Sequence, residues 1–374
     1  MKEKTTKLLT LINKNKVDAI LVSSVPNIIY LTGYSGFSKE EREAYLFIVA
    51  QPQGLTHKTP GVFGYIITDG RYSEAVSARV RDFKLIERFQ RDSLKKIFEG
   101  LSKKHAIKKL GIEEDNITVA EHKLLASCFN DLNHFSINSL RAIKDQNEIE
   151  TIEKACVLGD KAFNYVLNKL KKGVTEKEIA FELEYFIKKN GAELSFPTIV
   201  AFGKNSSVPH HQTSDNPLAT SDKLILLDFG VKLNNYCSDM TRTVFFGKPT
   251  SEQKKMYETV LDAQKKAIEY LESLILNHKS IKATEADKVA RDYIVSQGYP
   301  TIPHSLGHGV GLEIHEAPFL SPKSKDELKP GMVFSIEPGI YIPGVGGVRI
   351  EDLIVLETKG PCLLTKSPKE LIEL

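Results

Sequence analysis

The sequence predicts an α+β protein with two domains, an α/β domain in residues 1–140 and a larger domain in residues 141–374. Two observations predict this division. Helical and strand-like segments alternate in the first part, whereas the second part twice repeats a pair of helices followed by a strand hairpin, which suggests an internal duplication. The 374 residues, 41% of them hydrophobic, are enough for two domains with substantial cores.

The first domain is predicted from periodicity and turn residues. Its predicted helices cover residues 7–16, 71–80 and 93–105, and its predicted strands cover 19–23, 44–50 and 65–68. The stretch 51–64, rich in proline and glycine, is expected to connect two strands. Residues 69–72, Asp-Gly-Arg-Tyr, are most simply a junction between a strand and a helix and carry little functional signal.

The second domain is predicted to begin with a long amphipathic helix at 148–170. A second helix begins after Thr175, whose side chain can cap it together with Glu178 in a capping box, and ends at Asn190-Gly191. Further predicted helices cover 251–276 and 284–297, and further predicted strands cover 198–202, 331–337 and 348–357.

Composition and charge disfavour several classes of function. The formal net charge is +3 with acids and bases mixed along the chain, so we expect no nucleic-acid partner. The longest apolar runs are far shorter than a membrane span, and no signal peptide stands out. The cysteines lack CxxC spacing, which favours reduced core thiols in a cytoplasmic protein. They are Cys128, Cys156, Cys237 and Cys362.

Residues 224–246 are predicted to form a hairpin that carries two aspartates. The two-residue turn is centred either on Leu233-Asn234 or on Asn234-Asn235, because asparagine readily adopts the positive φ that such turns need. In the first register Asp228 and Asp239 are directly opposed, with Cβ atoms roughly 5 Å apart, and in the second they are diagonal neighbours at roughly 7–8 Å. Both registers place the two carboxylates on one face of the hairpin.

Two carboxylates this close repel each other, and burial between apolar runs makes both charges costly unless a cation lies between them. A metal ion is the simplest remedy. For an isolated pair of aspartates, a solvated hairpin with two surface side chains would be the simpler interpretation. The other motifs of this domain favour the metal site.

The second motif is the glycine-rich stretch 304–318, which holds three histidines, His304, His308 and His315, within twelve residues. Its glycines argue against a regular helix and for a tight loop entering a strand, which leaves a neutral imidazole free to bind a metal. A purely structural role for these histidines stays equally open at this point.

The third motif is a hairpin formed by residues 335–341 and 347–352 around the loop 343–347. The odd length of this loop keeps Glu337 and Glu351 on one face, either opposed or diagonal. The second domain therefore repeats the arrangement of the aspartate pair.

These motifs together supply five candidate metal ligands. Four carboxylates are more than one divalent ion needs, whereas two ions about 3.5 Å apart can share two of them. Oxygen-rich ligands with one imidazole favour Mn²⁺, with Co²⁺, Fe²⁺ and Zn²⁺ as alternatives, and the lack of thiolates argues against a structural zinc site. Such an ion pair activates water and polarises a carbonyl, which indicates hydrolysis. The candidates are Asp228, Asp239, His308, Glu337 and Glu351.

The same motifs closely resemble those of the pita-bread metallopeptidases, and within this family those of the aminopeptidase P and prolidase branch. The resemblance covers residues from about 140 to the end strongly. The first 140 residues resemble the creatinase-like amino-terminal domain more weakly, through residues 27–33. The motifs that carry the resemblance lie at 228–230, 236–243, 307–316, 336–341 and 348–352. The resemblance thus implies a creatinase-like domain followed by a pita-bread catalytic domain.

The resemblance also implies a role for each ligand. Asp239 and Glu351 would bridge two metal ions, and Asp228 would be a terminal ligand of one of them. His308 and Glu337 would complete the other. Glu337 would also act as the catalytic proton shuttle, taking a proton from the attacking water and passing it to the leaving proline nitrogen.

Further residues receive roles by the same resemblance. His315 would bind the scissile carbonyl and stabilise the tetrahedral intermediate, and His304 would line the proline subsite. A catalytic histidine that follows a proline is expected at His210 rather than His211, because His210 directly follows Pro209.

Arg349 and Tyr341 match substrate-binding residues of the proline-acting branch and favour it over methionine aminopeptidases. A simpler alternative makes Arg349 a salt-bridge partner of Glu351 or Asp352. The segment 221–228 is one residue longer than we expect for the family, so we predict a β-bulge before Asp228.

The leading hypothesis is a dinuclear metal-dependent exopeptidase that cleaves the bond between an amino-terminal residue and proline, an Xaa-Pro aminopeptidase. The alternative is a prolidase, which acts on Xaa-Pro dipeptides. A non-catalytic binding protein on the same fold is disfavoured because all five ligands are present. The resemblance further implies a homodimer and a proline-containing peptide as substrate.

Overall fold

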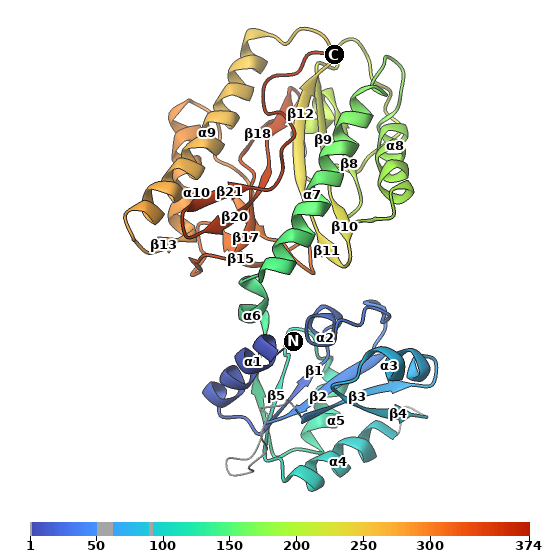
Figure 1. Ribbon diagram of the computed structural model, residues 1–374. Coiled ribbons are helices and arrows are strands. Elements are labelled where there is room, and N and C mark those ends of the chain that lie inside the picture. Colours follow the sequence, from blue (N-terminus) through green and yellow to red (C-terminus); the bar gives the residue numbers. More distant parts are fainter. Residues whose placement is uncertain (1, 51–62, 90–92) are drawn as a thin grey trace. The chain divides into compact units, whose positions relative to one another are not determined.

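The computed structural model describes residues 2–50, 63–89 and 93–374 (Figure 1). The chain divides into two compact units, Met1–Leu140 and Arg141–Leu374. The predicted connection at 51–64 lies outside the described residues except for its last two positions.

The first unit is built around a six-stranded sheet with the strand order β4-β3-β2-β1-β5-β6. Strand β2 pairs antiparallel with β1 and β3, and the other neighbours are parallel. The strands are β1 (Ala19–Val22), β2 (Ala44–Val49), β3 (Phe63–Asp69), β4 (Lys84–Arg88), β5 (Lys109–Ile112) and β6 (Asp131–His134). The helices are α1 (Lys2–Asn15), α2 (Val25–Thr32), α3 (Ser73–Arg79), α4 (Ser93–His105), α5 (Val119–Ala126) and α6 (Asn138–Ala142), which crosses the boundary between the units.

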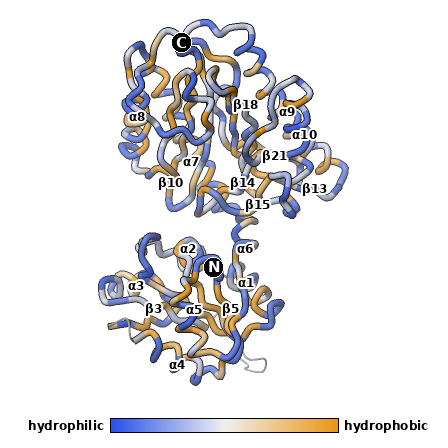
Figure 2. Tube along the Cα trace, turned by 180° about the vertical axis from the view of Figure 1, so that it is seen from behind, coloured by the Kyte–Doolittle hydropathy of each residue, from blue (hydrophilic) through white to orange (hydrophobic). Residues whose placement is uncertain are grey.

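The sequence of the central strands explains this α/β arrangement, which confirms the predicted class. Every residue of β1 and β2 is buried, as expected for apolar runs covered on both faces of a sheet. The strands β3 and β5 are correspondingly hydrophobic in Figure 2. The predicted junction at Asp69 is also present, because β3 ends there and α3 begins at Ser73.

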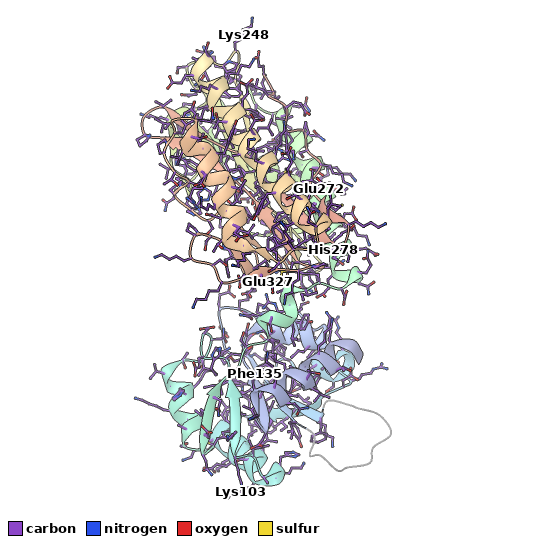
Figure 3. The ribbon with its side chains drawn as sticks, turned by 90° about the vertical axis from the view of Figure 1, so that its left-hand side faces the viewer. Lys103, Phe135, Lys248, Glu272, His278 and Glu327 are labelled. Carbon is purple, nitrogen blue, oxygen red and sulfur yellow. The ribbon has the colours of Figure 1, made fainter. Side chains whose placement is uncertain are left out.

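The second unit carries two pairs of helices, which flank its sheets in Figure 1. The pairs are α7 (Gln146–Leu167) with α8 (Glu176–Lys189) and α9 (Ser251–Leu276) with α10 (Ala283–Ser296). The capping box predicted at Thr175 is present, and Asp145 and Thr250 cap α7 and α9 in the same way. Glu272 and His278, on and just beyond α9, are exposed side chains labelled in Figure 3.

The strands of the second unit form several small sheets beside these helices. One sheet has the order β12-β9-β8, a second has the order β15-β14-β17-β20-β21, and β18 pairs with β19. Short pairings join β11-β10-β7 and β13-β16. The strands are β7 (Glu193–Leu194), β8 (Ile199–Phe202), β9 (Leu224–Phe229), β10 (Val231–Leu233), β11 (Tyr236–Cys237), β12 (Met240–Phe245), β13 (Ile281–Lys282), β14 (Gly307–Gly309), β15 (Glu316–Leu320), β16 (Glu327–Leu328), β17 (Val333–Ile336), β18 (Gly339–Ile342), β19 (Gly346–Arg349), β20 (Asp352–Glu357) and β21 (Gly360–Leu363), and a 3-10 helix covers Gly203–Ser207.

Each helix pair packs on its own sheet. One hydrophobic cluster joins α9 and α10 to β17–β20, and its members include Val260 of α9, Ala290 of α10 and Phe334 of β17. A second cluster joins α7 and α8 to β8, β9 and β12. Fully burying a large apolar side chain contributes roughly 1.5–3 kcal/mol, so these clusters hold the strands that carry the candidate site in place.

The aspartate hairpin adopts the second predicted register. Asn234 and Asn235 both have positive φ, 48° and 73°, and form the two-residue turn. Thr241 therefore opposes Asp228, and Asp239 is the diagonal neighbour of Asp228. The predicted bulge is wrong: all six residues of β9 pair with β12 in one register, and the chain reverses before the strand in a turn at residues 219–222.

The glutamate hairpin places Glu337 and Glu351 directly opposite each other, because the strands on both sides share one register. The strand predicted at 348–357 is interrupted at Glu351, between β19 and β20, and the strand predicted at 331–337 ends at Ile336, directly before Glu337. The backbone N–H of Glu337 donates to Leu306 and that of Glu351 donates to Thr241. The ladder breaks there because these N–H groups bind neighbouring segments instead.

Residues 307–309 form the strand β14 rather than a loop entering a strand, and its pairing with β15 is irregular after His308. Glycine is required on both sides of His308. A Cβ atom at Gly307 would lie 1.9 Å from the carbonyl oxygen of Ser335, and one at Gly309 would lie 2.3 Å from that of Ala317. The glycines therefore let neighbouring backbones approach the histidine closely.

The remaining predictions concern cysteines and membranes. All four cysteines are free thiols, but only Cys156 and Cys237 are buried, so the expectation of core thiols holds for two of them. Within the described residues, no helix combines the length and the apolar character needed to cross a bilayer.

Candidate metal centre

A cavity of about 700 Å³ lies within the second unit, and the candidate ligands line it. Predicted residues and newly identified ones meet on its wall. The predicted lining residues are Asp228, Asp239, His304, His308, His315, His210, Glu337, Arg349 and Glu351. The newly identified apolar ones are Phe196, Ile199, Ile314 and Phe319.

The five candidate ligands lie on or directly beside five different strands. Asp228 lies on β9 and Asp239 directly precedes β12, while His308 is the central residue of β14. Glu337 directly follows β17 and Glu351 directly precedes β20. Because each of these residues lies on a strand or directly beside one, the sheets largely set the positions of the side chains.

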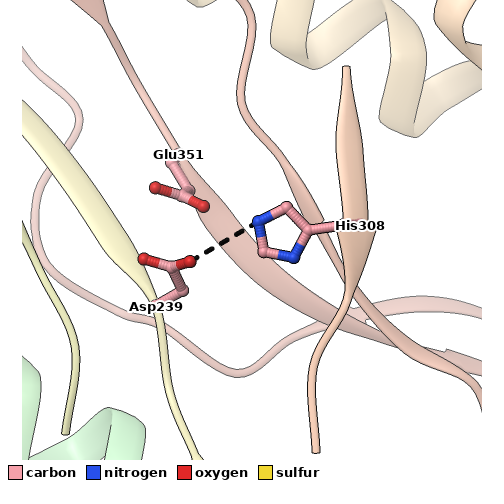
Figure 4. A group of neighbouring side chains, drawn as sticks. All are labelled: Asp239, His308 and Glu351. Carbon is pink, nitrogen blue, oxygen red and sulfur yellow. Dashed lines mark ion pairs between the residues drawn. The ribbon is translucent and has the colours of Figure 1, made fainter. Parts of the chain in front are cut away.

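Three of the ligands form a compact group. One ligand atom each from Asp239, His308 and Glu351 lies within 4.8 Å of the other two (Figure 4), and all three residues are buried. The Oδ2 atom of Asp239 lies 3.6 Å from Nε2 of His308. Within the described part of the chain, Oδ1 of Asp239 and Oε1 of Glu351 have no hydrogen-bond partner. Buried carboxylate oxygens without donors are unfavourable unless a cation binds them.

The tautomer of His308 supports the same conclusion. Its Nδ1 lies 3.2 Å from the carbonyl oxygen of Gly309, which can only accept, so Nδ1 carries the hydrogen. The Nε2 lone pair then faces the carboxylates of Asp239 and Glu337, at 3.6 and 3.3 Å. Burial lowers the pKa of His308 to about 4, so the ring is neutral and three acceptors meet in one place.

The carboxylates of the group also raise one another's pKa values. Burial, followed by the charge of Glu351, raises the pKa of Asp239 and that of Glu337 well above their usual values. Burial, followed by the charge of Asp228, raises the pKa of Glu351 to about 7. Divalent cations would relieve this repulsion. The unpaired oxygens and the oxygen-rich donor set therefore fit a site for divalent metal ions.

Arg349 forms an ion pair with Asp228, the fourth candidate carboxylate. Its Nη2 pairs with Asp228, whereas Asp352 pairs with Arg242 and Lys369. The simple alternative of a salt bridge from Arg349 to Glu351 or Asp352 is therefore not what the structure contains. Burial raises the pKa of Asp228, and Arg349 opposes this rise.

A chain of hydrogen bonds continues from Arg349 to His304. Arg349 Nη1 donates to the Tyr341 hydroxyl at 2.8 Å, and this hydroxyl lies 2.8 Å from Nε2 of His304. Nδ1 of His304 donates to the carbonyl oxygen of Ser305, so Nε2 accepts from Tyr341. Tyr341 is thus buried behind His304 and Arg349, outside the residues that line the cavity.

Three further histidines, His210, His211 and His315, line the same cavity. The ring of His315 meets that of His308 edge to face, with ring centroids 4.2 Å apart, and burial lowers the pKa of His315. His210 is exposed on the cavity wall. His211 also lines the cavity, but its Nε2 lies 2.8 Å from a carboxylate oxygen of Glu176.

Sequence reasoning missed two polar residues that support this centre. Thr241 donates from Oγ1 to Glu351 at 2.7 Å, and Glu176 holds the segment that carries His210 and His211. Thr241 had a usable signal, because it follows Asp239 by two positions and so shares its strand face. Glu176 had none, since its partners are distant in sequence.

Comparison of the chain with known proteins identifies its family. The family description Metallopeptidase family M24 matches residues 150–358, more than half of the chain, and Creatinase/Prolidase N-terminal domain matches residues 4–143. The Xaa-Pro dipeptidase of Pyrococcus horikoshii is 38% identical over 381 residues, covering 100% of this chain and 99% of its own.

Two solved structures are similar over the whole chain. An Xaa-Pro dipeptidase from Bacillus anthracis has a TM-score of 0.88 at 34% identity, covering 100% of this chain and 99% of its own. An X-Pro aminopeptidase from Thermotoga maritima has a TM-score of 0.82 at 31% identity, covering 99% and 100%. The chain therefore belongs to metallopeptidase family M24, with a creatinase/prolidase-type domain before a pita-bread domain, and it is an enzyme, a peptidase that uses divalent metal ions.

Proposed function

We propose that this peptidase cleaves the bond between an amino-terminal residue and proline, and that Xaa-Pro dipeptides are its preferred substrates. The observation that carries the metal-dependent part is the buried group of Asp239, His308 and Glu351, whose carboxylate oxygens lack donors. The proline and dipeptide parts are supported by similarity to relatives named Xaa-Pro dipeptidase.

Xaa-Pro aminopeptidase, the leading hypothesis from the sequence, becomes the second candidate. The similar structure of the Thermotoga maritima X-Pro aminopeptidase keeps it open. Both activities cleave the same bond and differ in the product, which is free proline for a dipeptidase and a longer peptide for an aminopeptidase.

In this proposal the five ligands hold two divalent ions, with Mn²⁺ first and Co²⁺, Fe²⁺ or Zn²⁺ as alternatives. When bound, such ions supply a nucleophile from water at neutral pH and polarise the scissile carbonyl. Asp239 and Glu351 would hold both ions, Asp228 would hold one of them, and His308 with Glu337 would hold the other. Arg349 holds Asp228 in place through its ion pair and opposes the rise that burial causes in the pKa of Asp228.

Glu337 carries the proton in this scheme. Its carboxylate accepts from the Ser335 hydroxyl at 3.0 Å and lies 3.3 Å from Nε2 of His308. It takes a proton from the attacking water and gives it to the proline nitrogen as the C–N bond breaks, so that the nitrogen leaves as a neutral amine.

The histidines bind the substrate in this scheme. His315 donates an N–H to the carbonyl oxygen as negative charge develops on it, and His210 is a second donor on the cavity wall. His304 has both ring nitrogens engaged by Ser305 and Tyr341, so it presents its ring face to proline. Tyr341, which does not line the cavity, acts through His304, whereas Arg349 lines the cavity and also acts through Asp228.

The test compares hydrolysis of an Xaa-Pro dipeptide with that of a matched Xaa-Pro-Yaa tripeptide. Mn²⁺, Co²⁺ or Zn²⁺ is added to the metal-stripped protein, and Asp239→Ala serves as an inactive control. We expect metal-dependent cleavage with the dipeptide preferred. Preference for the tripeptide would support the aminopeptidase, and no metal-dependent cleavage of either peptide would contradict the proline specificity.

Association into a homodimer and a cytoplasmic location stay predictions. Light scattering coupled to size-exclusion chromatography tests the first, with twice the chain mass of 41.8 kDa as the expected result. A monomer at micromolar concentration would contradict it.

A further inference from the structure

Thr241 touches a metal ligand although it is not a ligand itself. It is fully buried, and it faces the same side of the hairpin as Asp239. The register places it opposite Asp228, and its carbonyl oxygen accepts the backbone N–H of Glu351 at 3.1 Å. Its side chain therefore lies between the two hairpins that supply the carboxylates.

The hydroxyl of Thr241 has a defined direction of hydrogen bonding. Arg349 Nε lies 3.0 Å from Oγ1 and can only donate, so Oγ1 accepts from it. The single hydroxyl hydrogen is then left for a carboxylate. Its acceptor by geometry is Oε2 of Glu351, 2.7 Å away, and the same hydroxyl also lies close enough to Asp228 to lower the pKa of that carboxyl. The resulting chain runs from Arg349 through Thr241 to Glu351.

This chain selects one oxygen of Glu351. Oε2 receives the Thr241 hydrogen, whereas Oε1 is buried and lacks a hydrogen-bond partner among the described residues. The same guanidinium pairs with Asp228 through Nη2. One arginine thus holds two ligands, Asp228 directly and Glu351 through the Thr241 hydroxyl.

We propose that Thr241 is a positioning residue of the metal centre, whose hydroxyl fixes the Glu351 carboxylate so that Oε1 stays directed to a divalent cation. The inference rests on the metal centre of the proposed function. Hydrogen-bond partners of metal ligands set the orientation of those ligands, and removing one typically weakens metal binding about 10- to 100-fold.

Thr243 offers a matched control on the same strand. It is also buried, and it lies two residues further on, so it shares the strand face of Thr241. Its hydroxyl donates to the carbonyl oxygen of Arg349 at 3.0 Å and accepts the backbone N–H of Arg349 at 3.2 Å. It therefore also links β12 to β19, but its hydrogen-bond partners are backbone atoms of Arg349 and not a ligand side chain.

The experiment measures Mn²⁺ binding to the metal-stripped full chain by titration calorimetry, with bound metal counted by elemental analysis. The variants are Thr241→Val, Thr241→Ala, Thr241→Ser and Thr243→Val, and the melting temperature of each metal-free protein is recorded. We expect Thr241→Val and Thr241→Ala to bind Mn²⁺ about 10- to 100-fold more weakly. Thr241→Ser, which restores the hydroxyl, and Thr243→Val should bind nearly as tightly as the wild type.

Two outcomes would overturn the inference while leaving the proposed function intact. One is Mn²⁺ binding by Thr241→Val and Thr241→Ala that equals the wild type. The other is an equal loss of affinity in Thr243→Val, which would show a general effect of loosening the strands. Failure of the wild-type chain to bind Mn²⁺ would overturn the inference and the metal-dependent function together.

Discussion

Glu176 and Glu351 are two buried glutamates of the same unit, and their surroundings differ in one respect. Glu176, in the first turn of α8, is fully buried and accepts hydrogen bonds on both carboxylate oxygens. Glu351 is equally buried, but only its Oε2 has a donor among the described residues. The donors to Glu176 are Phe202 N, Asn205 Nδ2, His211 Nε2, Ser214 N and Ser214 Oγ.

The pKa values follow the donors rather than the burial. Burial alone raises the pKa of Glu176, but the hydrogen bonds from Ser214, Asn205 and Phe202 outweigh it, so the pKa is lowered overall. The pKa of Glu351 is raised to about 7 by burial and by the charge of Asp228. Glu176, whose two oxygens both accept hydrogen bonds, thus stabilises the fold. Glu351, which has one buried oxygen without a donor, is suited to binding a cation.

Removing the charge of Glu351 should have the largest effect. Glu351→Gln removes the charge of one of the five candidate metal ligands, and metal-ion stabilisation of a transition state is worth several kcal/mol, so we expect peptidase activity to fall about a thousandfold or more. The metal-free protein should melt at a higher temperature, because the repulsion with Asp228 is relieved. Activity assays and calorimetry check both effects, with the exposed Glu357→Gln as control. A lower melting temperature would contradict the comparison.

Removing the carboxylate of Glu176 should instead destabilise the fold. Glu176→Ala leaves buried donors without a partner, and we expect it to lower the free energy of unfolding by about 3 kcal/mol, with and without metal. Mn²⁺ affinity should not change, because Glu176 contacts none of the five ligands. Denaturant unfolding measures the loss. Glu184→Ala, partly exposed on the same helix, should cost less than about 0.5 kcal/mol.

Added metal should stabilise the protein only when the carboxylate of Glu351 is present, whether or not that of Glu176 is. Mn²⁺ at about 100 times its dissociation constant should stabilise the wild-type protein by about 2.7 kcal/mol. Glu351→Gln should lose most of this gain, whereas Glu176→Ala should keep all of it. Melting curves with and without Mn²⁺ provide the measurement, and equal stabilisation of both variants would count against a metal site at Glu351.

The pH dependence of stability should show the smallest effect. The folded-state pKa of Glu176 lies below its usual 4.5, so its contribution is present above about pH 4.5 and is lost as the pH falls through the folded-state value. The difference in unfolding free energy between wild type and Glu176→Gln should therefore shrink as the pH falls from about pH 6 to about pH 3. A constant or growing difference would mean that Glu176 carries no lowered pKa.

Much of the fold, and the grouping of the candidate ligands around one cavity, was predictable. The capping box at Thr175, the asparagine turn at Asn234 and the side-chain alternation of strands act over a few residues, so the sequence contains their full cause. Alternation alone put Asp228 with Asp239, and Glu337 with Glu351, on shared faces. The resemblance assigned the motifs to a family that the comparisons confirmed.

Other features were decided by tertiary structure. The sequence left two registers for the aspartate turn and two partners for Arg349, and it predicted a bulge that β9 does not have. Arg349 pairs with Asp228, a residue more than a hundred positions away. Such choices depend on which side chains the sheets bring together, which no local pattern encodes.

The sequence by itself therefore determined which residues are available for metal chemistry and on which strand faces they lie. Only the tertiary structure decided which carboxylate oxygens are left without donors. It also decided that the Tyr341 hydroxyl donates to His304 and that the Thr241 hydroxyl donates to Glu351. The physical reason is that local structure depends on near neighbours, whereas hydrogen bonding and desolvation of a buried group depend on every segment packed around it.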